Sequence, residues 1–103
     1  MEKKIMHVTN DDGLITIALE GDLTSANLND FRAMVQEEIE AGNKSFCIDF
    51  SGAAIIDSMG IGCLVATYNS LRQKEGTIQL SNVPENLRDV FQVMRLDRIL
   101  SIV

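Results

Sequence analysis

A chain of 103 residues has room for one domain, and 46% of its residues are apolar, which is enough for a hydrophobic core. The formal net charge of −6 argues against nucleic acid and anionic lipid as ligands, because both attract basic surfaces. No segment approaches the ~20 apolar residues of a membrane helix, and no apolar run follows the first lysines. We therefore expect a single domain over residues 1–103, cytoplasmic, without a signal peptide or membrane insertion.

Two strands and a turn are predicted at the start of the chain. Ile5–Asn10 and Leu14–Glu20 have strand patterns, and the Asn-Asp-Asp-Gly sequence at 10–13 favours a turn between them. The short connection predicts an antiparallel hairpin. The residues of the second strand that are expected to share one face are Ile15, Ile17 and Leu19.

Helices and strands alternate in the rest of the chain. The predicted elements are a helix at Ser25–Ala41, a strand at Ser45–Phe50, a helix at about Met59–Lys74, a strand at Thr77–Ser81, a helix from Pro84, and an apolar tail at Ile99–Val103 that adds a strand or a short packed segment. Thr24 or Ser25 is expected to cap the first helix. The third helix is expected to bury Leu87, Val90, Phe91 and Met94.

This order of elements predicts the fold class. Strands that are joined by helices should be parallel, with right-handed crossovers. Because these strands alternate apolar and polar residues, only one face of the sheet is expected to be covered. We predict an α/β fold, with a small mixed β-sheet of four to five strands and helices mainly on one face.

The segment Ala53–Gly62 leads from a strand into the second helix. Ser58 stands where an N-cap is expected and Asp57 adds a favourable charge, so the pair is explained by helix stability alone. Gly60 and Gly62, however, each cost up to ~1 kcal/mol relative to alanine in a helix. Their lack of side chains would let another protein approach the Ser58 hydroxyl. A helix N-terminus also accommodates a phosphate, which would add roughly −1.5 to −2 charges.

The six residues Asp57-Ser58-Met59-Gly60-Ile61-Gly62 are similar to the Asp-Ser-x-Gly-Leu-Gly signature of STAS domains, in particular the stand-alone bacterial anti-sigma-factor antagonists. Further segments support the resemblance, which extends from about Val8 to Ile102: Leu-Glu-Gly-Asp-Leu at 19–23, Phe-Cys-Ile-Asp-Phe-Ser at 46–51, and Leu-Asp-Arg-Ile-Leu at 96–100. The chain departs from the family pattern at Thr24, where an aspartate is common, and at Met59, where many members carry serine or threonine.

The resemblance implies a phosphorylation switch. The unphosphorylated domain would bind a partner that is both anti-sigma factor and serine kinase, and the sigma factor would be released. The kinase would use ATP to phosphorylate Ser58 and break the complex, and a phosphatase would restore the antagonist. The implied partner-binding residues are Asp22, Asp57, Ser58, Met59, Gly60, Ile61 and Gly62. On this view Ser58→Asp weakens partner binding, Ser58→Ala keeps it, and Gly60→Ala perturbs kinase docking more than folding.

The same residues bear on other possible functions. A STAS-like subunit that docks on the ATPase of a lipid-transport complex would use the same helical face without phosphorylation, and Thr24 favours it slightly. An enzyme is disfavoured, since no nucleophile has a base in its motif and His7 is the only histidine. Asp49 lacks the partners of a response-regulator phosphorylation site. We expect no catalysis, cofactor or metal, and two buried free thiols, Cys47 and Cys63.

Overall fold

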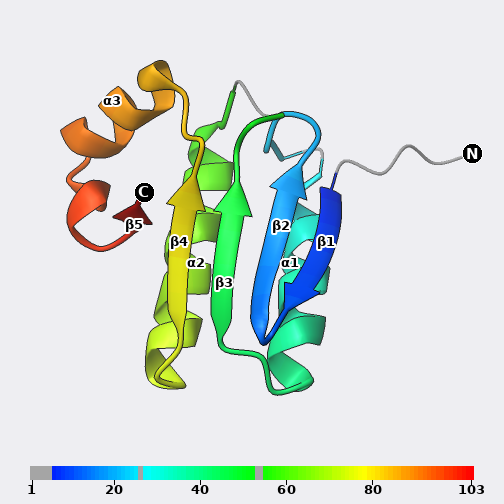
Figure 1. Ribbon diagram of the computed structural model, residues 1–103. Coiled ribbons are helices and arrows are strands. Elements are labelled where there is room, and N and C mark those ends of the chain that lie inside the picture. Colours follow the sequence, from blue (N-terminus) through cyan, green and yellow to red (C-terminus); the bar gives the residue numbers. More distant parts are fainter. Residues whose placement is uncertain (1–5, 26, 53–54) are drawn as a thin grey trace, which may run out of the picture.

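The computed structural model describes residues 6–25, 27–52 and 55–103 (Figure 1). The elements within these residues are β1 (Met6–Asp11), β2 (Leu14–Leu19), α1 (Leu28–Glu40), β3 (Ser45–Asp49), α2 (Ser58–Gln73), β4 (Thr77–Ser81), α3 (Glu85–Val93), the short 3-10 helix η1 (Leu96–Arg98) and β5 (Ser101–Ile102). Ile5, where the first strand was expected to begin, and the side chain of His7 lie outside the part that is described.

The strands form one mixed sheet in the order β1-β2-β3-β4-β5. β1 and β2 are antiparallel, and the pairs β2–β3, β3–β4 and β4–β5 are parallel. Asp12 and Gly13, at the tip of the hairpin, both have positive φ, which is the backbone that a tight two-residue hairpin turn requires. The predicted hairpin and mixed sheet are thus confirmed, and the apolar tail adds the last strand.

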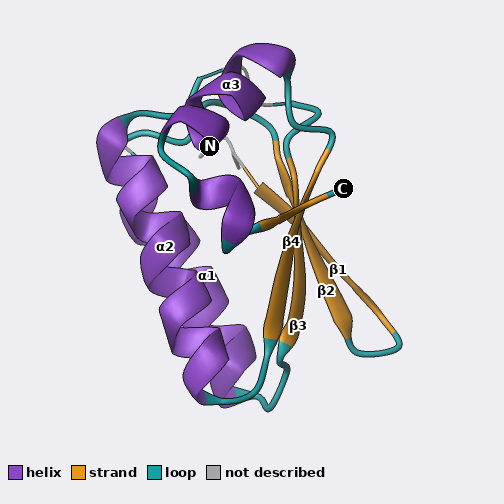
Figure 2. Ribbon diagram, turned by 90° about the vertical axis from the view of Figure 1, so that its left-hand side faces the viewer, coloured by secondary structure: helices purple, strands orange, loops and turns teal. Residues whose placement is uncertain are grey.

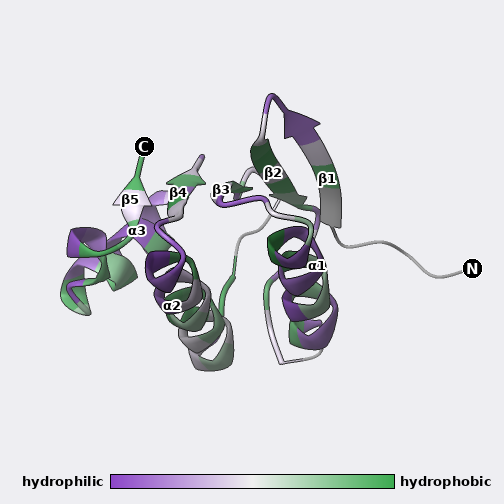
Figure 3. Ribbon diagram, turned by 90° about the horizontal axis from the view of Figure 1, so that it is seen from below, coloured by the Kyte–Doolittle hydropathy of each residue, from purple (hydrophilic) through white to green (hydrophobic). Residues whose placement is uncertain are grey.

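The helices cover one face of this sheet, as the alternating strands predicted. Figures 2 and 3 show α1 and α2 side by side against the same face, and none of the helices in the described residues lies on the opposite face. The apolar residues of β2 and β3 point toward the helices and are buried, and small side chains such as Thr16 and Cys47 occupy the open face. The residues at the centre of the core include Ile15, Ile17, Phe31, Phe46, Ile48, Phe50 and Leu64. Within the described residues, no helix is both long and apolar enough for a bilayer span.

α3 lies at the end of the sheet where the parallel strands finish, and only part of its apolar surface is covered (Figure 1). Leu87 and Phe91 are one turn apart and buried, and the Phe91 ring meets the Phe50 ring edge to face, with centroids 6.4 Å apart. Val90 and Met94 were expected to be buried but are 39% and 51% exposed. The periodicity identified an apolar side of the helix, but none of the described elements covers Val90 and Met94 fully.

Asp49 connects the ends of β3 and β4. Its Oδ1 accepts hydrogen bonds from the Ser51 N–H and from the Asn82 side-chain amide, both at 2.9 Å. The Asn82 amide first, and the Ser51 N–H second, lower the pKa of Asp49 from its usual value, because both donors stabilise the charged form. This carboxylate therefore has a structural function where β3 and β4 end.

These two hydrogen bonds predict that part of the free energy of unfolding depends on pH. Asn82→Ala is expected to lower the free energy of unfolding by about 1–2 kcal/mol near neutral pH. The lost hydrogen bond to the half-buried Asp49 carboxylate, which water screens, accounts for about 1 kcal/mol or less. The rest comes from placing alanine at the positive φ of Asn82 and does not vary with pH. A lowered folded-state pKa gives stability that is present above the unfolded pKa of about 4 and lost as pH falls through the folded pKa. The difference between wild type and Asn82→Ala should therefore shrink below pH ~4, as measured by urea unfolding at a series of pH values.

Asn10→Ala provides the control, since Asn10 also accepts a turn hydrogen bond, from the Gly13 N–H at 3.0 Å, through a neutral amide. Its effect should vary less with pH. A constant difference for Asn82→Ala from pH 7 to pH 2 would contradict the role given to the Asp49 charge.

Candidate functional site

The N-terminus of α2 is capped by Asp57 rather than by Ser58. Asp57 has an extended backbone, and its Oδ1 accepts a hydrogen bond of 2.8 Å from the Gly60 N–H. Ser58 is the first residue of the helix itself. The sequence prediction that Ser58 is the N-cap is therefore wrong by one residue, because aspartate and serine are equally good caps and only the backbone geometry distinguishes them.

This shift leaves the Ser58 side chain accessible. Ser58 is exposed, and its hydroxyl forms no hydrogen bond with any residue in the part of the chain that the structure describes. Met59 beside it is 60% exposed, and Gly62, one turn further along α2, is open to solvent. Another protein could therefore reach the Ser58 oxygen without any change in the fold.

Two loops meet beside Ser58, and a pair of carboxylates connects them. Asp57 Oδ2 accepts a hydrogen bond of 3.1 Å from the Ser25 N–H, across to the loop between β2 and α1. In the opposite direction, Asp22 Oδ1 accepts one of 3.0 Å from the Ile55 N–H. The backbones also pair at Leu23 and Ile56. Each loop thus holds the other through its own aspartate, and together they form one surface around Ser58.

Asp22 and Asp57 were predicted to bind a partner, which stays a prediction, and in the structure each accepts a hydrogen bond from the backbone of the other loop. The signal for these bonds was present in the sequence only as a preference of aspartate for turns and helix caps. The pairing between two loops more than 30 residues apart in the chain required the tertiary structure. Ser25 and Ile55 were not among the predicted site residues, although Ile55 is 56% exposed beside the motif.

The loop before α1 differs from the prediction. Asn27 is the N-cap residue of α1, and its side chain makes no capping bond to the helix. Its Oδ1 instead accepts a hydrogen bond of 2.9 Å from the Thr24 N–H, and its Nδ2 donates to the Asp22 carbonyl oxygen. Thr24 and Ser25 are therefore loop residues and not caps. Asn27 shapes the loop that contacts Asp57.

The two glycines of the motif have different surroundings. Gly60 is buried, and a Cβ there would lie 2.6 Å from the Leu23 carbonyl oxygen and 2.7 Å from Ile56 Cγ1. At Gly62 a Cβ would meet nothing within 4 Å. The prediction that Gly60 keeps space open for a partner is wrong, because the loop of its own chain fills that space. Ile61 is likewise buried in the core.

Removing the cap should loosen the whole site. Asp57→Ala is expected to lower the free energy of unfolding by about 2 kcal/mol, the upper end of the range for an N-cap, because it also leaves the Ser25 N–H without its acceptor. Urea unfolding measures the loss, and hydrogen exchange at Ser25 and Gly60 should speed up.

Asp30→Ala is the matched control for the loss of a first-turn carboxylate, since Asp30 lies in the first turn of α1 and is exposed. It should cost no more than about 0.5 kcal/mol. If Asp57→Ala were no more destabilising than Asp30→Ala, the bridging function of Asp57 would be refuted.

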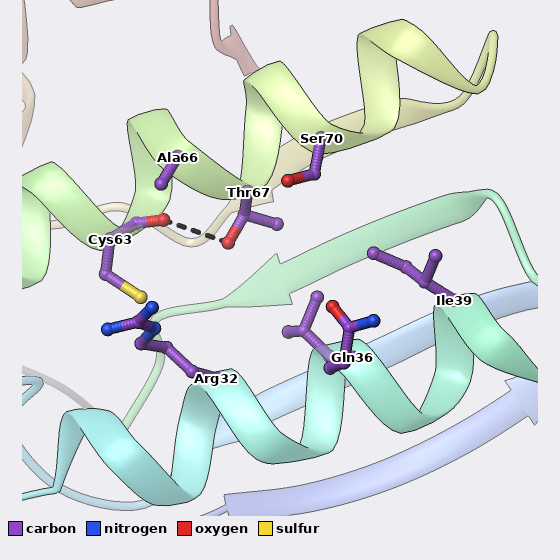
Figure 4. A pocket seen from close by; sticks show the side chains of 8 residues that line it. Arg32, Gln36, Ile39, Cys63, Ala66, Thr67 and Ser70 are labelled. Atoms are coloured by element: carbon purple, nitrogen blue, oxygen red, sulfur yellow. Dashed lines mark hydrogen bonds between the residues drawn. The ribbon is translucent and has the colours of Figure 1, made fainter.

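A hollow of about 120 Å³ lies between α1 and α2 (Figure 4). Its lining includes Arg32, Gln36 and Cys63, and Thr67 donates its hydroxyl hydrogen to the Cys63 carbonyl oxygen at 2.9 Å. Burial raises the pKa of the Cys63 thiol, which keeps it protonated and a poor nucleophile. Cys63 is a buried free thiol as expected, whereas Cys47 is only half-buried. In the described part of the chain, no group of three or more potential ligands could hold a metal ion.

Comparison with known proteins finds similar sequences and similar folds. BtrV of Bordetella bronchiseptica, which carries the name of anti-sigma factor antagonist, is 27% identical over 90 residues, covering 85% of this chain and 78% of its own. The fold resembles that of an anti-sigma factor antagonist of Thermotoga maritima, with a TM-score of 0.89 at 23% identity, over 94% of this chain and 84% of that one. It also resembles the Bacillus cell fate determinant SpoIIAA in its phosphorylated form, with a TM-score of 0.77 at 22% identity, over 95% of this chain and 90% of that one.

The family assignment rests on nearly the whole chain. The family model described as "Mlab, STAS domain" matches residues 6–102, a range that contains the hairpin, both loops of the Ser58 surface and all three α-helices. The five-stranded mixed sheet with helices on one face agrees with the fold of the solved relatives. The chain therefore belongs to the STAS domain family.

Proposed function

We propose that this chain is an anti-sigma factor antagonist, which binds an anti-sigma factor through the surface around Ser58 and is released when Ser58 is phosphorylated. The observation that carries the proposal is the position of Ser58, which is exposed at the first residue of α2 while its neighbour Asp57 provides the cap. The fold does not need the Ser58 hydroxyl. The names of BtrV and of the Thermotoga and Bacillus relatives support the same function.

Phosphorylation at this position would change the surface without unfolding the domain. Phosphate is favourable at a helix N-terminus, where free N–H groups and the helix dipole attract negative charge. It would also place about −1.5 to −2 charges beside the Asp57 carboxylate, on a chain that already has a net charge of −6. A partner surface that fits a neutral serine and an exposed methionine would be repelled by that charge.

The remaining components follow from this proposal. The anti-sigma factor is also the serine kinase and uses ATP, a phosphatase restores the unphosphorylated antagonist, and both act in the cytoplasm. The chain itself supplies no catalytic group and no cofactor. It acts only as a substrate and a binding protein.

Intact-mass spectrometry tests the proposal. The protein is incubated with ATP and a lysate of its own host, and any phosphorylated residue is mapped. We expect a single phosphate on Ser58, absent from Ser58→Ala and retained in Ser25→Ala, which removes the neighbouring exposed hydroxyl. Absence of phosphate on Ser58, in a lysate that phosphorylates a control antagonist, would contradict the switch.

A second candidate is a docking subunit of an ABC-type lipid-transport complex that is not regulated by phosphorylation. Thr24 favours it, because the chain lacks the aspartate that is common in the antagonists at that position. The same Ser58 surface would then bind an ATPase constitutively. The mass experiment separates the two functions, since only the antagonist is phosphorylated.

A further inference from the structure

Met59 is the most exposed of the methionines whose side chains the structure describes. Its side chain is 60% exposed in the first turn of α2, directly after Ser58. Met94, at the end of α3, is 51% exposed, and Met34 on α1 is partly buried and packs against the core. A thioether is therefore presented to solvent beside the hydroxyl on which the proposed switch depends.

The turn that carries Met59 is fixed, and its surroundings are open. The Gly60 N–H bonds to Asp57 Oδ1 at 2.8 Å, and the Ile61 N–H bonds to the Asp57 carbonyl oxygen at 3.0 Å. Residues three apart on a helix are neighbours, and the neighbour of Met59 in the next turn is Gly62. Gly62 has no side chain, and even a Cβ there would meet nothing within 4 Å. A small molecule in solution can thus reach the Met59 sulfur without any movement of the fold.

An accessible thioether reacts with peroxides by oxygen transfer. The Met59 sulfur attacks one oxygen of hydrogen peroxide, the O–O bond breaks, and an S–O bond forms. The departing hydroxide takes the proton of the transferred oxygen and leaves as water. The sulfur loses two electrons and the peroxide gains them. The product is methionine sulfoxide, which is polar where the thioether is apolar, and which sulfoxide reductases convert back to methionine.

A sulfoxide at this position would oppose the binding of another protein at Ser58. Ser58 and Met59 are consecutive and both exposed, so a protein that covers the Ser58 hydroxyl also approaches the Met59 side chain. A thioether gives up little hydration when it is covered. A sulfoxide oxygen loses its hydrogen bonds to water, and that loss is costly unless the partner supplies a donor.

We propose that Met59 is an oxidation site, at which a peroxide weakens the binding of the anti-sigma factor to the surface around Ser58. This inference rests on the proposed function and adds to it a second, reversible modification of the same surface that needs no ATP. The oxidised antagonist stays folded, because most of the Met59 side chain lies outside the core. It is a poorer substrate for the kinase that modifies Ser58.

Peptide mass mapping and the phosphorylation assay together test the inference. During treatment with hydrogen peroxide, Met59 is expected to gain one oxygen faster than Met34 does. The peroxide is then removed, and the protein is incubated with ATP and a desalted lysate of its host, which lacks the small-molecule reductants that would restore methionine. The initial rate of Ser58 phosphorylation should fall about tenfold, the effect of one polar group that is covered without a partner.

Three variants separate oxidation of Met59 from other effects of peroxide. Met59→Leu keeps an apolar side chain of similar size, and its rate should stay within about twofold of untreated wild type before and after peroxide. Met59→Gln introduces a polar oxygen without any oxidant and should be slow in both conditions. Met94→Leu is the matched control at the other exposed methionine, and peroxide should still slow it about tenfold. Urea unfolding of oxidised and untreated wild type should coincide.

The outcomes distinguish this inference from the proposed function. If Met59 is oxidised no faster than Met34, or if peroxide slows Met59→Leu as much as wild type, the oxidation site is refuted. Equal phosphorylation of oxidised and untreated wild type would also refute it, while the switch at Ser58 would stand. If untreated wild type gains no phosphate in a lysate that phosphorylates a control antagonist, the proposed function fails and this inference fails with it.

Discussion

Replacing Gly60 with alanine is expected to lower the free energy of unfolding by about 2 kcal/mol or more, although alanine is the better helix former. The added Cβ would lie 2.6 Å from the Leu23 carbonyl oxygen, which is too close for any real contact and belongs to backbone that cannot move aside cheaply. Leu23 N–H and Ile55 O are hydrogen-bonded at 3.1 Å in the same place, so relieving the clash would separate the two loops. Chemical denaturation measures the loss.

Gly62→Ala is the matched control, two residues along the same helix. A Cβ there meets nothing within 4 Å, so alanine should raise the free energy of unfolding by up to about 1 kcal/mol. If a partner approaches this open position closely, the stabilised variant should nevertheless bind the anti-sigma factor more weakly. A Gly60→Ala protein as stable as wild type would refute the packing described for the two loops. It would favour the earlier interpretation from the motif, in which Gly60 lets a partner approach Ser58.

Replacing Ser58 with aspartate is expected to weaken binding to the anti-sigma factor by about 30-fold or more. A charge without a partner in a desolvated interface costs about 2 kcal/mol or more, and each 1.4 kcal/mol is tenfold in the dissociation constant. Ser58→Asp should not lower the stability of the fold, because a carboxylate in the first turn of a helix is favourable and Asp57 already supplies the cap. Ser58→Ala should bind as wild type does, since the hydroxyl has no hydrogen bond with the described residues.

Ser70→Asp tests whether the effect depends on the position or only on the charge. Ser70 is exposed and lies on the same helix, three turns after Ser58. Ser70→Asp therefore adds the same charge as Ser58→Asp, but far from the proposed interface. It should change the affinity by less than threefold or so at moderate salt, because exposed charges at that distance are largely screened. If Ser58→Asp and Ser70→Asp weakened binding to the anti-sigma factor equally, the effect would come from net charge in general, and the local switch at Ser58 would be refuted.

The differences between prediction and structure occur where several residues of similar propensity compete or where an element meets the edge of the sheet. Asp57 and Ser58 are both good caps, and the sequence could not decide between them. The spacing of apolar residues correctly predicted the α3 helix, but spacing alone does not predict how much of its apolar side other elements cover. Val90 and Met94 are exposed because the helix extends past the sheet, where none of the described elements covers them fully.

The sequence by itself determined the order of the main helices and strands, the antiparallel hairpin, the parallel pairing of β2, β3 and β4, the covered face and the position of Ser58 at the start of α2. Whether the tail forms β5 or only packs on the sheet needed the structure. The properties that the sequence determined depend on local patterns, such as the alternation along β2, the helical spacing in α1 and the turn at Asp12 and Gly13. The tertiary structure alone decided which side chains of the motif face outward. Asp22 and Asp57 each accept an N–H from the other loop, and Gly60 lies against Leu23, because segments distant in the sequence meet at the ends of the parallel strands.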